Sequence, residues 1–307
     1  MHVTHHLEDL PKFKKPIVSI GTFDGVHHGH RKIISRIVEE AKSVDGESIL
    51  LSFEPHPRLI VDPSARIKLL STMKEKIEIL STLGLDHFVV APFTKEFSEL
   101  DPKVYVQDFL CKYFYPHTLI IGFDHHFGKG REGNLQLLES MSKDNNFRIE
   151  EIPKQLIEDT KVSSTKIRLA IEEGRISDAN NYLGTPYRLH AKVVAGDQRG
   201  RTIGYPTANL QLDNLHKLVP ASGVYAVKVE FEGNLYKGMM NIGFRPTFGP
   251  SVCTLEVHLF DINLNLYDKE LKVFMMKRLR NEQKFSSIHE LKEQLAIDED
   301  NARRALD

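Results

Sequence analysis

The chain has 307 residues, 41% of them hydrophobic, which is enough for two domains that each have a core. Its 41 Lys and Arg residues balance 42 Asp and Glu residues, which argues against nucleic acid or an anionic membrane as a partner. Two cysteines, Cys111 and Cys253, are too few for a disulfide framework or a thiolate metal cage. Without a signal peptide or a bilayer-spanning apolar run, we expect a cytoplasmic protein, and the oligomeric state stays open.

The first half of the sequence alternates short apolar runs with helical patterns. Strands are predicted at 16–24, 48–55, 86–93 and 118–124, and helices at 30–43, 72–84 and 102–114. Strands that alternate with helices of this length are typical of a parallel sheet covered on both faces.

The pattern changes near residue 186. Runs rich in β-forming residues at 187–197, 223–243, 253–261 and 269–280 predict a small antiparallel sheet or barrel, and 286–306 predicts an amphipathic helix. Gly233-Asn234 lies between two alternating segments and indicates a hairpin. Residues 162–184 read as helical, so the predicted domains are 1–185 and 186–307.

Three histidines, His27, His28 and His30, directly follow the first predicted strand. Parallel sheets bind ligands at the carboxyl ends of their strands, where helix N-termini offer N–H groups to anions, and Gly25 and Gly29 allow a close approach. The histidines could be solvated loop residues. They could form a zinc site with Asp124, His125 and His126. They could also clamp phosphate, because His27 and His30 share one helix face.

Another segment resembles a dinucleotide fingerprint. Gly128, Gly130 and Gly133 spell GxGxxG, and Glu150 stands where a ribose-binding acid would belong. Five residues, 123–127, separate Gly122 of the strand from the first of these glycines, whereas the fingerprint needs a tight turn at the strand end, so a dehydrogenase is disfavoured. "DHH" at 124–126 suggests a metal phosphoesterase, but further carboxylate motifs are not evident.

Two motifs of the first half resemble those of the nucleotidyltransferase superfamily. His27 to His30 match its HxGH signature, and "VSSTKIR" (162–168) resembles its SSTxxR signature. The hydroxyls of Ser163, Ser164 and Thr165 at a helix start, with Arg168 one turn on, would form a second anion site. Two such helix starts predict one ATP held between them.

The second half has a glycine-rich segment, "GDQRGRTIGYPTANL" (196–210), that is not a Walker loop. Thr207 and Asn209, two residues apart, offer oxygens suited to hydrated Mg²⁺, although a glycine-rich turn with an Asn cap would look the same. "GRTIGYPTAN" resembles the glycine loop and PTAN signature of riboflavin kinases. Together, the two halves resemble the bacterial bifunctional riboflavin kinase/FAD synthetase family over essentially the whole chain.

This resemblance implies a Rossmann-like α/β nucleotidyltransferase domain followed by an antiparallel β-barrel kinase domain with a C-terminal helix. It implies that riboflavin and ATP give FMN, and that FMN and a second ATP give FAD and pyrophosphate, with Mg²⁺ bound to the ATP. ATP, riboflavin, FMN and FAD would be the small-molecule partners. The alternatives are a zinc-dependent phosphoester hydrolase that uses the histidine motifs and a non-catalytic flavin-binding module.

The resemblance also implies roles for individual residues. Glu256 would be the general base of the kinase. His27 and His30 would be catalytic residues of the transferase that donate hydrogen bonds to phosphates. His125 stands where many family members have Phe, so the resemblance does not extend to aromatic stacking by Phe at this position. The expected nucleotide-binding residues are Gly21, Phe23, Asp24, Gly29, Asp124, Ser163, Ser164, Thr165, Arg168, Gly196, Gly200, Arg201 and Gly204. The expected flavin-binding residues are Phe53, His56, Asn241, Arg278 and Arg280, and the expected metal ligands are Thr207 and Asn209.

Overall fold

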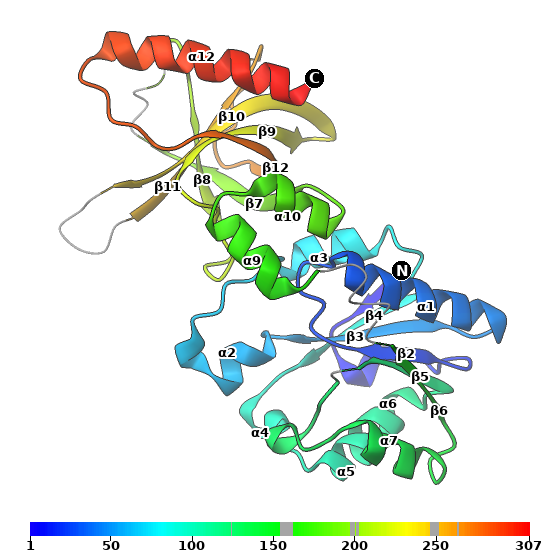
Figure 1. Cartoon of the computed structure of the whole chain (residues 1–307). Coiled ribbons are helices and arrows are strands. Elements are labelled where there is room, and N and C mark those ends of the chain that lie inside the picture. The colour runs from blue at the N-terminus through cyan, green and yellow to red at the C-terminus, as the bar shows by residue number, and fades with distance from the viewer. Residues whose placement is uncertain (124, 154–161, 197–199, 201–202, 246–251, 263) are drawn as a thin grey trace. The chain divides into compact units, whose positions relative to one another are not determined.

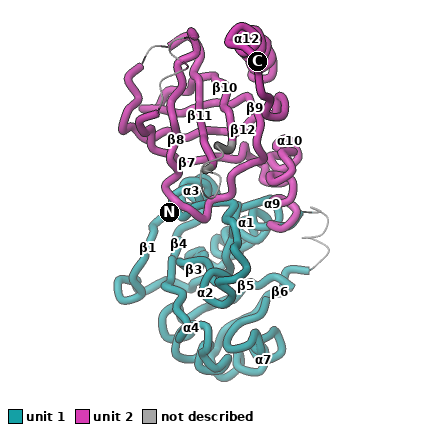
Figure 2. The backbone as a smooth tube through the Cα atoms, turned by 90° about the vertical axis from the view of Figure 1, so that its left-hand side faces the viewer, with its two compact units in different colours: residues 1–163 teal, residues 164–307 magenta. Residues whose placement is uncertain are grey.

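The computed structural model describes residues 1–123, 125–153, 162–196, 200, 203–245, 252–262 and 264–307. The chain divides into two compact units, Met1–Ser163 and Ser164–Asp307, which Figure 2 distinguishes by colour. None of the helices in these residues has the length and apolar character needed to cross a bilayer.

The first unit is built on a parallel sheet with the strand order β1-β4-β3-β2-β5-β6 (Figure 1). Its strands are β1 (His2–Thr4), β2 (Ile17–Ile20), β3 (Ser48–Glu54), β4 (His87–Pro92), β5 (Thr118–Gly122) and β6 (Arg148–Ile152). From β2 the chain winds one way through β3 and the other way through β5. A ligand crevice therefore belongs at the carboxyl ends of β2 and β5.

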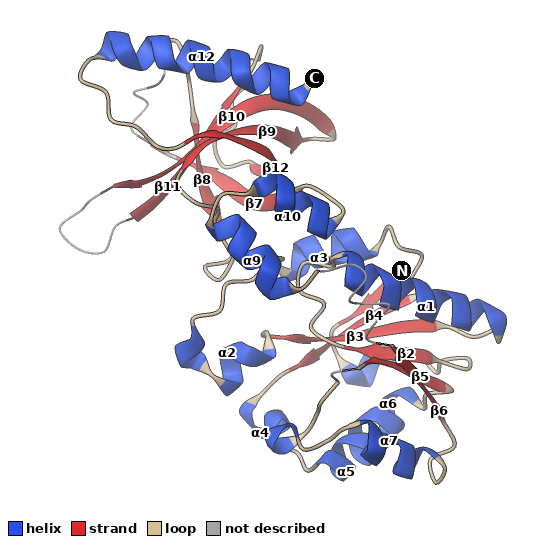
Figure 3. Ribbon diagram, viewed as in Figure 1, coloured by secondary structure: helices blue, strands red, loops and turns tan. Residues whose placement is uncertain are grey.

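Helices cover both faces of this sheet, as Figure 3 shows. The described helices are α1 (His28–Ser43), α2 (Pro57–Val61), α3 (Met73–Leu80), α4 (Lys95–Ser98), α5 (Pro102–Val104), α6 (Lys112–Phe114) and α7 (Leu135–Ser142). One apolar cluster joins α1 and α3 to the sheet through residues such as Ile34, Ile37 and Leu80. A second cluster on the other face includes Phe109 and Leu138. Each fully buried side chain of this kind contributes about 1.5–3 kcal/mol to stability.

The predicted parallel α/β arrangement is confirmed, with several local differences, among them the unpredicted helices α2, α4 and α7. β1 and β6 were not predicted, because His2–Thr4 is too short to show a period and Arg148–Ile152 carries charged residues. The helix predicted at 102–114 is present, but its middle, Tyr105–Cys111, is a π-helix. The first helix begins at His28 rather than at His30.

The second unit is a closed antiparallel barrel with the strand order β10-β11-β8-β7-β12-β9. Its strands are β7 (Tyr187–Val194), β8 (Ala208–Leu212), β9 (Gly223–Phe231), β10 (Asn234–Arg245), β11 (Val252–Leu259) and β12 (Glu270–Arg280). Two helices precede the barrel, α9 (Ser164–Glu172) and α10 (Ile176–Leu183), and α12 (Ile288–Leu306) follows it. The predicted barrel and C-terminal helix are confirmed.

The β9–β10 hairpin differs by one residue from the prediction. Phe231 pairs with Asn234, so Glu232 and Gly233 form the two-residue turn, and Asn234 already belongs to β10. Both turn residues have positive φ, 49° and 79°, as a type I′ turn requires. The predicted Gly233-Asn234 turn was therefore wrong by one position, because the strand pairing and not the Gly-Asn pair sets the register.

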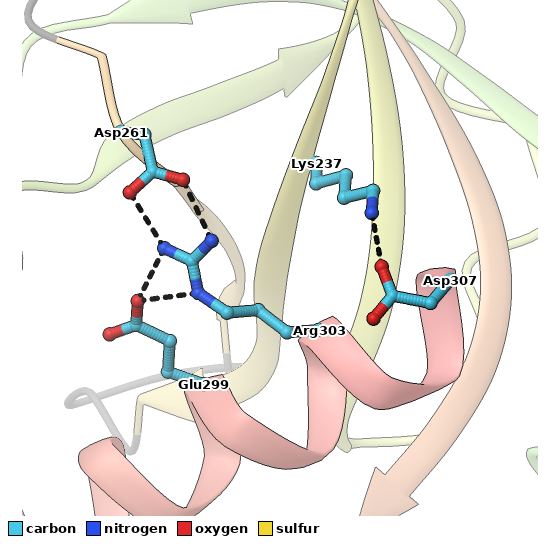
Figure 4. A network of polar contacts seen from close by, with 5 residues as sticks. All are labelled: Lys237, Asp261, Glu299, Arg303 and Asp307. Carbon is cyan, nitrogen blue, oxygen red and sulfur yellow. Dashed lines mark hydrogen bonds and ion pairs between the residues drawn. The ribbon is translucent and has the colours of Figure 1, made fainter.

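The last helix, α12, lies against the barrel through apolar and charged contacts. Ala302 and Leu306 pack with Ala226, Met239 and Phe260. Figure 4 shows the polar contacts of this helix with the barrel. Arg303 donates to Asp261 at 2.7 and 2.8 Å and to Glu299, and Lys237 pairs with Asp307.

Candidate active sites

The loop between β2 and α1 has an unusual backbone. Phe23, Gly25 and Val26 have φ values of 46°, 84° and 44°, and non-glycine residues rarely adopt this left-handed region. Such strain persists only where the surroundings fix it, and it clusters at functional sites. Asp24 provides part of the fixing, because its buried carboxylate accepts from the N–H groups of Leu70 and Ser71 at 3.0–3.1 Å.

His27 and His30 meet at the first turn of α1. His27 is the N-cap of the helix, and its Nδ1 accepts from the backbone N–H of His30 at 3.3 Å. Because Nδ1 accepts, the neutral ring of His27 carries its proton on Nε2, where it can donate to a ligand. The two rings stack with centroids 3.6 Å apart, and Phe23 packs edge-on against His30. His28 is exposed and takes no part in this pair.

Burial, followed by the neighbouring His27 and Lys76, holds the pKa of His30 well below its ordinary value of 6.5. The His30 ring is therefore neutral at physiological pH in the ligand-free protein. Its Nδ1 is buried and has no hydrogen-bond partner among the described residues. A negatively charged phosphate beside the ring would favour the protonated form and raise this pKa.

The SSTxxR segment forms the start of α9 in the second unit. Ser163 and Thr165 are exposed, Ser164 is half-buried, and Ile167, Ala170 and Ile171 form the buried face of the helix. The ammonium of Lys166 lies 4.6 Å from the ring centroid of Tyr182 on α10. The half-buried Arg168 lies one turn from the helix start, as expected. The binding of one ATP by this segment and His27 stays a prediction.

The remaining predicted residues of the first unit have identifiable local contacts. A Cβ on Gly21 would lie 3.1 Å from the ring of Phe23, and Gly29 is buried in the first turn of α1. Phe53 packs with Phe93 and Phe97. His56 is the N-cap of α2 and accepts from Arg58 N–H at 3.2 Å. Asp124 lies outside the described residues.

Three of the residues that the zinc and dehydrogenase interpretations invoked are committed to other contacts. His27 and His30 stack on each other, and within the described residues no three His, Cys, Asp or Glu side chains are grouped to hold a metal. Glu150 lies on β6 and binds Arg36 at 2.5 and 2.7 Å, so it is already paired. Phe127 and Gly133 pair across the GxGxxG loop, which is not a turn at the end of a strand.

In the barrel, several predicted site residues lie in one transverse row. Asn209 on β8 is directly opposite Glu256 on β11, and Glu256 is directly opposite Asn241 on β10. The row continues through Val224 on β9 to Arg280 on β12. Directly opposite residues place their side chains on the same face, with Cβ atoms about 5 Å apart. Residues distant in sequence, including the predicted base and a predicted metal ligand, are therefore neighbours.

Burial shows which face of the barrel this row occupies. Leu255 and Val257 flank Glu256 in sequence and are 5% and 1% exposed, whereas Glu256 is half-buried. Because successive side chains of a strand point to opposite faces, Glu256 is on the outer side of the barrel wall. Here the Glu256 carboxylate has the amide side chains of Asn209 and Asn241 as its neighbours on the two adjacent strands.

The glycine-rich segment packs closely on this row. A Cβ on Gly196 would lie 2.0 Å from Nδ2 of Asn209, so any side chain there would have to displace the Asn209 amide. Gly200 accepts from Tyr205 N–H at 2.9 Å, and a Cβ on it would come within 3.4 Å of the Thr207 hydroxyl. Gly204 has a φ of 89°. Arg201 lies outside the described residues.

The two predicted flavin-binding arginines hold parts of the second unit together. Arg278 donates from Nη2 to the Ser222 carbonyl, and a Cβ on Gly174 would lie 2.7 Å from Cδ of Arg278. Arg280 binds the buried Asp298 of α12 at 2.6–3.0 Å. These contacts give both residues structural roles, and their contact with flavin stays a prediction.

Two residues near the sites were not predicted. His258 follows Glu256 by two positions on β11, and its Nδ1–H donates to the Pro206 carbonyl at 2.7 Å, next to Thr207. The alternation of β11 could have shown that His258 shares a face with Glu256. Lys76 lies under the loop after β2. Its position in an ordinary amphipathic helix gives no sequence signal that it lies near the site.

Comparisons with known proteins agree with this geometry. Residues 10–166 match the family model for FAD synthetase, and residues 183–306 match the model for riboflavin kinase. The bifunctional riboflavin kinase/FMN adenylyltransferase of Bacillus subtilis is 36% identical over 99% of this chain and 97% of its own length. The protein of that description from Escherichia coli K12 is 36% identical over 97% and 95%.

A solved structure, described as a macrolide-efflux protein from Streptococcus pneumoniae, is 29% identical and covers 98% of each chain with a TM-score of 0.87. The efflux named there belongs to that protein's description, and the likeness extends over the length of the fold. From the two matched family models and the near-complete coverage of its curated relatives, the chain belongs to the bifunctional riboflavin kinase/FMN adenylyltransferase family.

Proposed function

We propose that this chain makes FAD from riboflavin in two ATP-dependent steps, one in each unit. The barrel phosphorylates riboflavin to FMN and releases ADP. The α/β unit then transfers AMP from a second ATP to FMN and releases pyrophosphate. The observation that carries the proposal is the transverse row of the barrel, because it brings Glu256 beside Asn209 and the glycine-rich segment.

In the kinase step, Glu256 takes the proton from the terminal ribityl hydroxyl of riboflavin. The oxygen then attacks the γ-phosphorus of ATP, and the bond from this phosphorus to the β-phosphate oxygen breaks. A carboxylate positioned at the nucleophile contributes about 10²–10⁴-fold to such reactions. His258 holds the Pro206 carbonyl and so positions Thr207 relative to Glu256.

Magnesium would enter the barrel site with ATP as part of the substrate. The Thr207 hydroxyl and the Asn209 side-chain carbonyl are hard oxygen donors, which fit Mg²⁺ and leave room for water and phosphate ligands. When bound, the ion neutralises charge on the phosphates. The close contact of Gly196 with the Asn209 amide group fixes the direction of that side chain.

In the transferase step, a phosphate oxygen of FMN attacks the α-phosphorus of ATP, and the α–β bridging bond breaks. His27 and His30 donate hydrogen bonds to the phosphates at the N-terminus of α1, where the backbone N–H groups also favour anions. The proposed roles of Ser163, Ser164, Thr165 and Arg168 in nucleotide binding are supported by the resemblance of their segment to the SSTxxR signature. No covalent enzyme intermediate is needed, since orientation and charge stabilisation account for the catalysis.

The cytoplasmic location inferred from the sequence remains a prediction.

A single incubation tests the proposed function. Purified protein is mixed with riboflavin and Mg-ATP, and the products are separated by chromatography. We expect FMN to form first and FAD to follow. The ADP released should equal all the FMN formed, including FMN that is converted to FAD, and the pyrophosphate released should equal the FAD formed. Omission of ATP is the control. Binding of riboflavin without any ATP-dependent product would show a non-catalytic flavin-binding module, and release of phosphate without flavin products would show a hydrolase.

A further inference from the structure

Lys76 is a buried cation under the loop that joins β2 to α1. Its side chain comes from α3, and the residue is only 5% exposed. Nζ donates to the Thr22 carbonyl at 2.6 Å and lies 3.4 Å from Oγ of Ser52 on β3. Ser52 Oγ also donates to the Thr22 carbonyl, at 3.3 Å. Two donors therefore converge on one carbonyl near the start of loop 21–27, which leads into the HxGH motif and is called the HxGH loop below.

The same loop is held two residues later by groups of the opposite polarity. The Asp24 carboxylate accepts from the N–H groups of Leu70 and Ser71, in the segment that leads into α3. Ser71 Oγ also accepts from Gly25 N–H at 3.0 Å. Hydrogen bonds from α3 and the segment before it thus hold the loop at Thr22, Asp24 and Gly25. These hydrogen bonds explain how the left-handed backbone at Phe23 and Gly25 is maintained.

The charge of Lys76 also has a consequence for the histidine pair. Burial lowers the pKa of Lys76, while the carboxylates of Asp24 and Glu54 act against this shift. The groups that act on His30 are His27 at the N-cap and Lys76 from α3, and both lower its pKa, as does burial. The ammonium of Lys76 is thus partly compensated by Asp24 and Glu54 in the ligand-free protein, and an anion at the start of α1 would add a further favourable interaction.

We propose that Lys76 is a positioning residue for adenylyl transfer, which fixes the HxGH loop through the Thr22 carbonyl and places positive charge behind the phosphates of ATP. No sequence motif invoked above includes Lys76. The proposal rests on the transferase function of the first unit. Its failure is distinguishable from failure of that function, because the native enzyme would still make FAD.

The test compares Lys76→Met and Lys76→Gln with the native protein. Lys74→Met, on the same helix but exposed, is the matched control. We expect Lys76→Met to lower kcat/KM for FAD formation about 100-fold, the loss typical of a small displacement at a site, while riboflavin phosphorylation by the same chain is unchanged. Gln keeps a donor without the charge, so Lys76→Gln should recover part of kcat but not the affinity for Mg-ATP.

Titration of histidine signals by NMR distinguishes this role from a merely structural one. Loss of the Lys76 charge should raise the pKa of His30, which the titration of its ring signals measures directly. Unchanged FAD formation in either variant, or an unchanged His30 titration in a folded variant, would overturn the proposal. If both variants lose the native circular dichroism spectrum, the test is the NMR titration of His30 in the native protein. The pKa of His30 must lie below 6.5 and must rise when inorganic pyrophosphate is added. Failure of either result would refute the proposal.

Discussion

Among single residues, the kinase site depends on how closely Gly196 approaches Asn209. The space that a Cβ would need at Gly196 is filled by the amide of Asn209, at 2.0–2.8 Å. A side chain at position 196 must therefore displace the Asn209 amide from the row that contains Glu256. The contact links a glycine of the loop to a predicted metal ligand on β8.

We therefore expect Gly196→Ala to lower riboflavin phosphorylation by about 10²-fold, since displacements of about 1 Å at a site have effects of this size. FAD formation from supplied FMN should be unchanged. Ala195→Ser, at the exposed neighbouring position, is the control and should retain native rates. Steady-state assays of both reactions make the comparison. Native kinase activity in Gly196→Ala would show that Asn209 does not need its observed position.

The motifs marked single residues, whereas the contacts of these residues came from the structure. HxGH marked His27 and His30, and the strand register shows that Asn209 and Glu256 are neighbours, while the roles of all four stay predictions. The stacking of the two histidines and the role of Lys76 could not be predicted. The stacking depends on how two side chains of the first turn of α1 are oriented, and the contacts of Lys76 depend on how α3 packs under the loop after β2. The spacing of residues in a sequence records neither.

At the level of elements, α12 is attached to the barrel by one buried ion pair and several exposed ones. Asp298 is 1% exposed and accepts from Arg280 Nε and Nη2 and from Gln294. In contrast, the Arg304–Asp300 pair of the same helix is exposed. Removal of one partner from a buried pair leaves an uncompensated charge, whereas exposed pairs contribute little.

Asp298→Ala should lower the free energy of unfolding of the second unit by about 3 kcal/mol, because the Arg280 guanidinium loses its partner. Asp300→Ala should change it by about 0.5 kcal/mol or less. Urea unfolding followed by NMR signals of barrel residues measures both values. Equal effects of the two substitutions would contradict the assignment of Asp298 as the main anchor of α12.

The predicted strands of the first unit are strongly apolar, and the missed strands β1 and β6 are not. β2, β3, β4 and β5 are buried runs and could be recognised from sequence. β6 carries Glu150 and Glu151 because it lies at the sheet edge, so its alternation is weak. The hairpin turn was displaced by one residue, because Glu232 adopts a positive φ that its residue type does not suggest.

In the molecule as a whole, the helices that carry the second nucleotide signature pack with the barrel. Asn180 on α10 donates to the Met275 carbonyl at 2.9 Å and accepts from Tyr187 N–H at 2.7 Å, and Ala221 N–H donates to Ile171 on α9. The contacts divide the chain after Ser163, whereas the sequence pattern changes near residue 186. The division into functional domains at 185/186 stays a prediction. The pattern of apolar and polar residues along the chain could not reveal this packing, because the packing depends on long-range contacts of both helices.

The central claim is that one chain carries two independent phosphate chemistries. The most direct test gives Glu256→Gln and His30→Ala each substrate separately with Mg-ATP and measures products by chromatography. Glu256→Gln should lose about 10²–10⁴-fold in FMN formation, as expected for loss of a general base, but convert supplied FMN to FAD at the native rate. His30→Ala should accumulate FMN from riboflavin and form little FAD. If either folded variant loses both reactions to the same extent, the two sites are not independent and the account is contradicted.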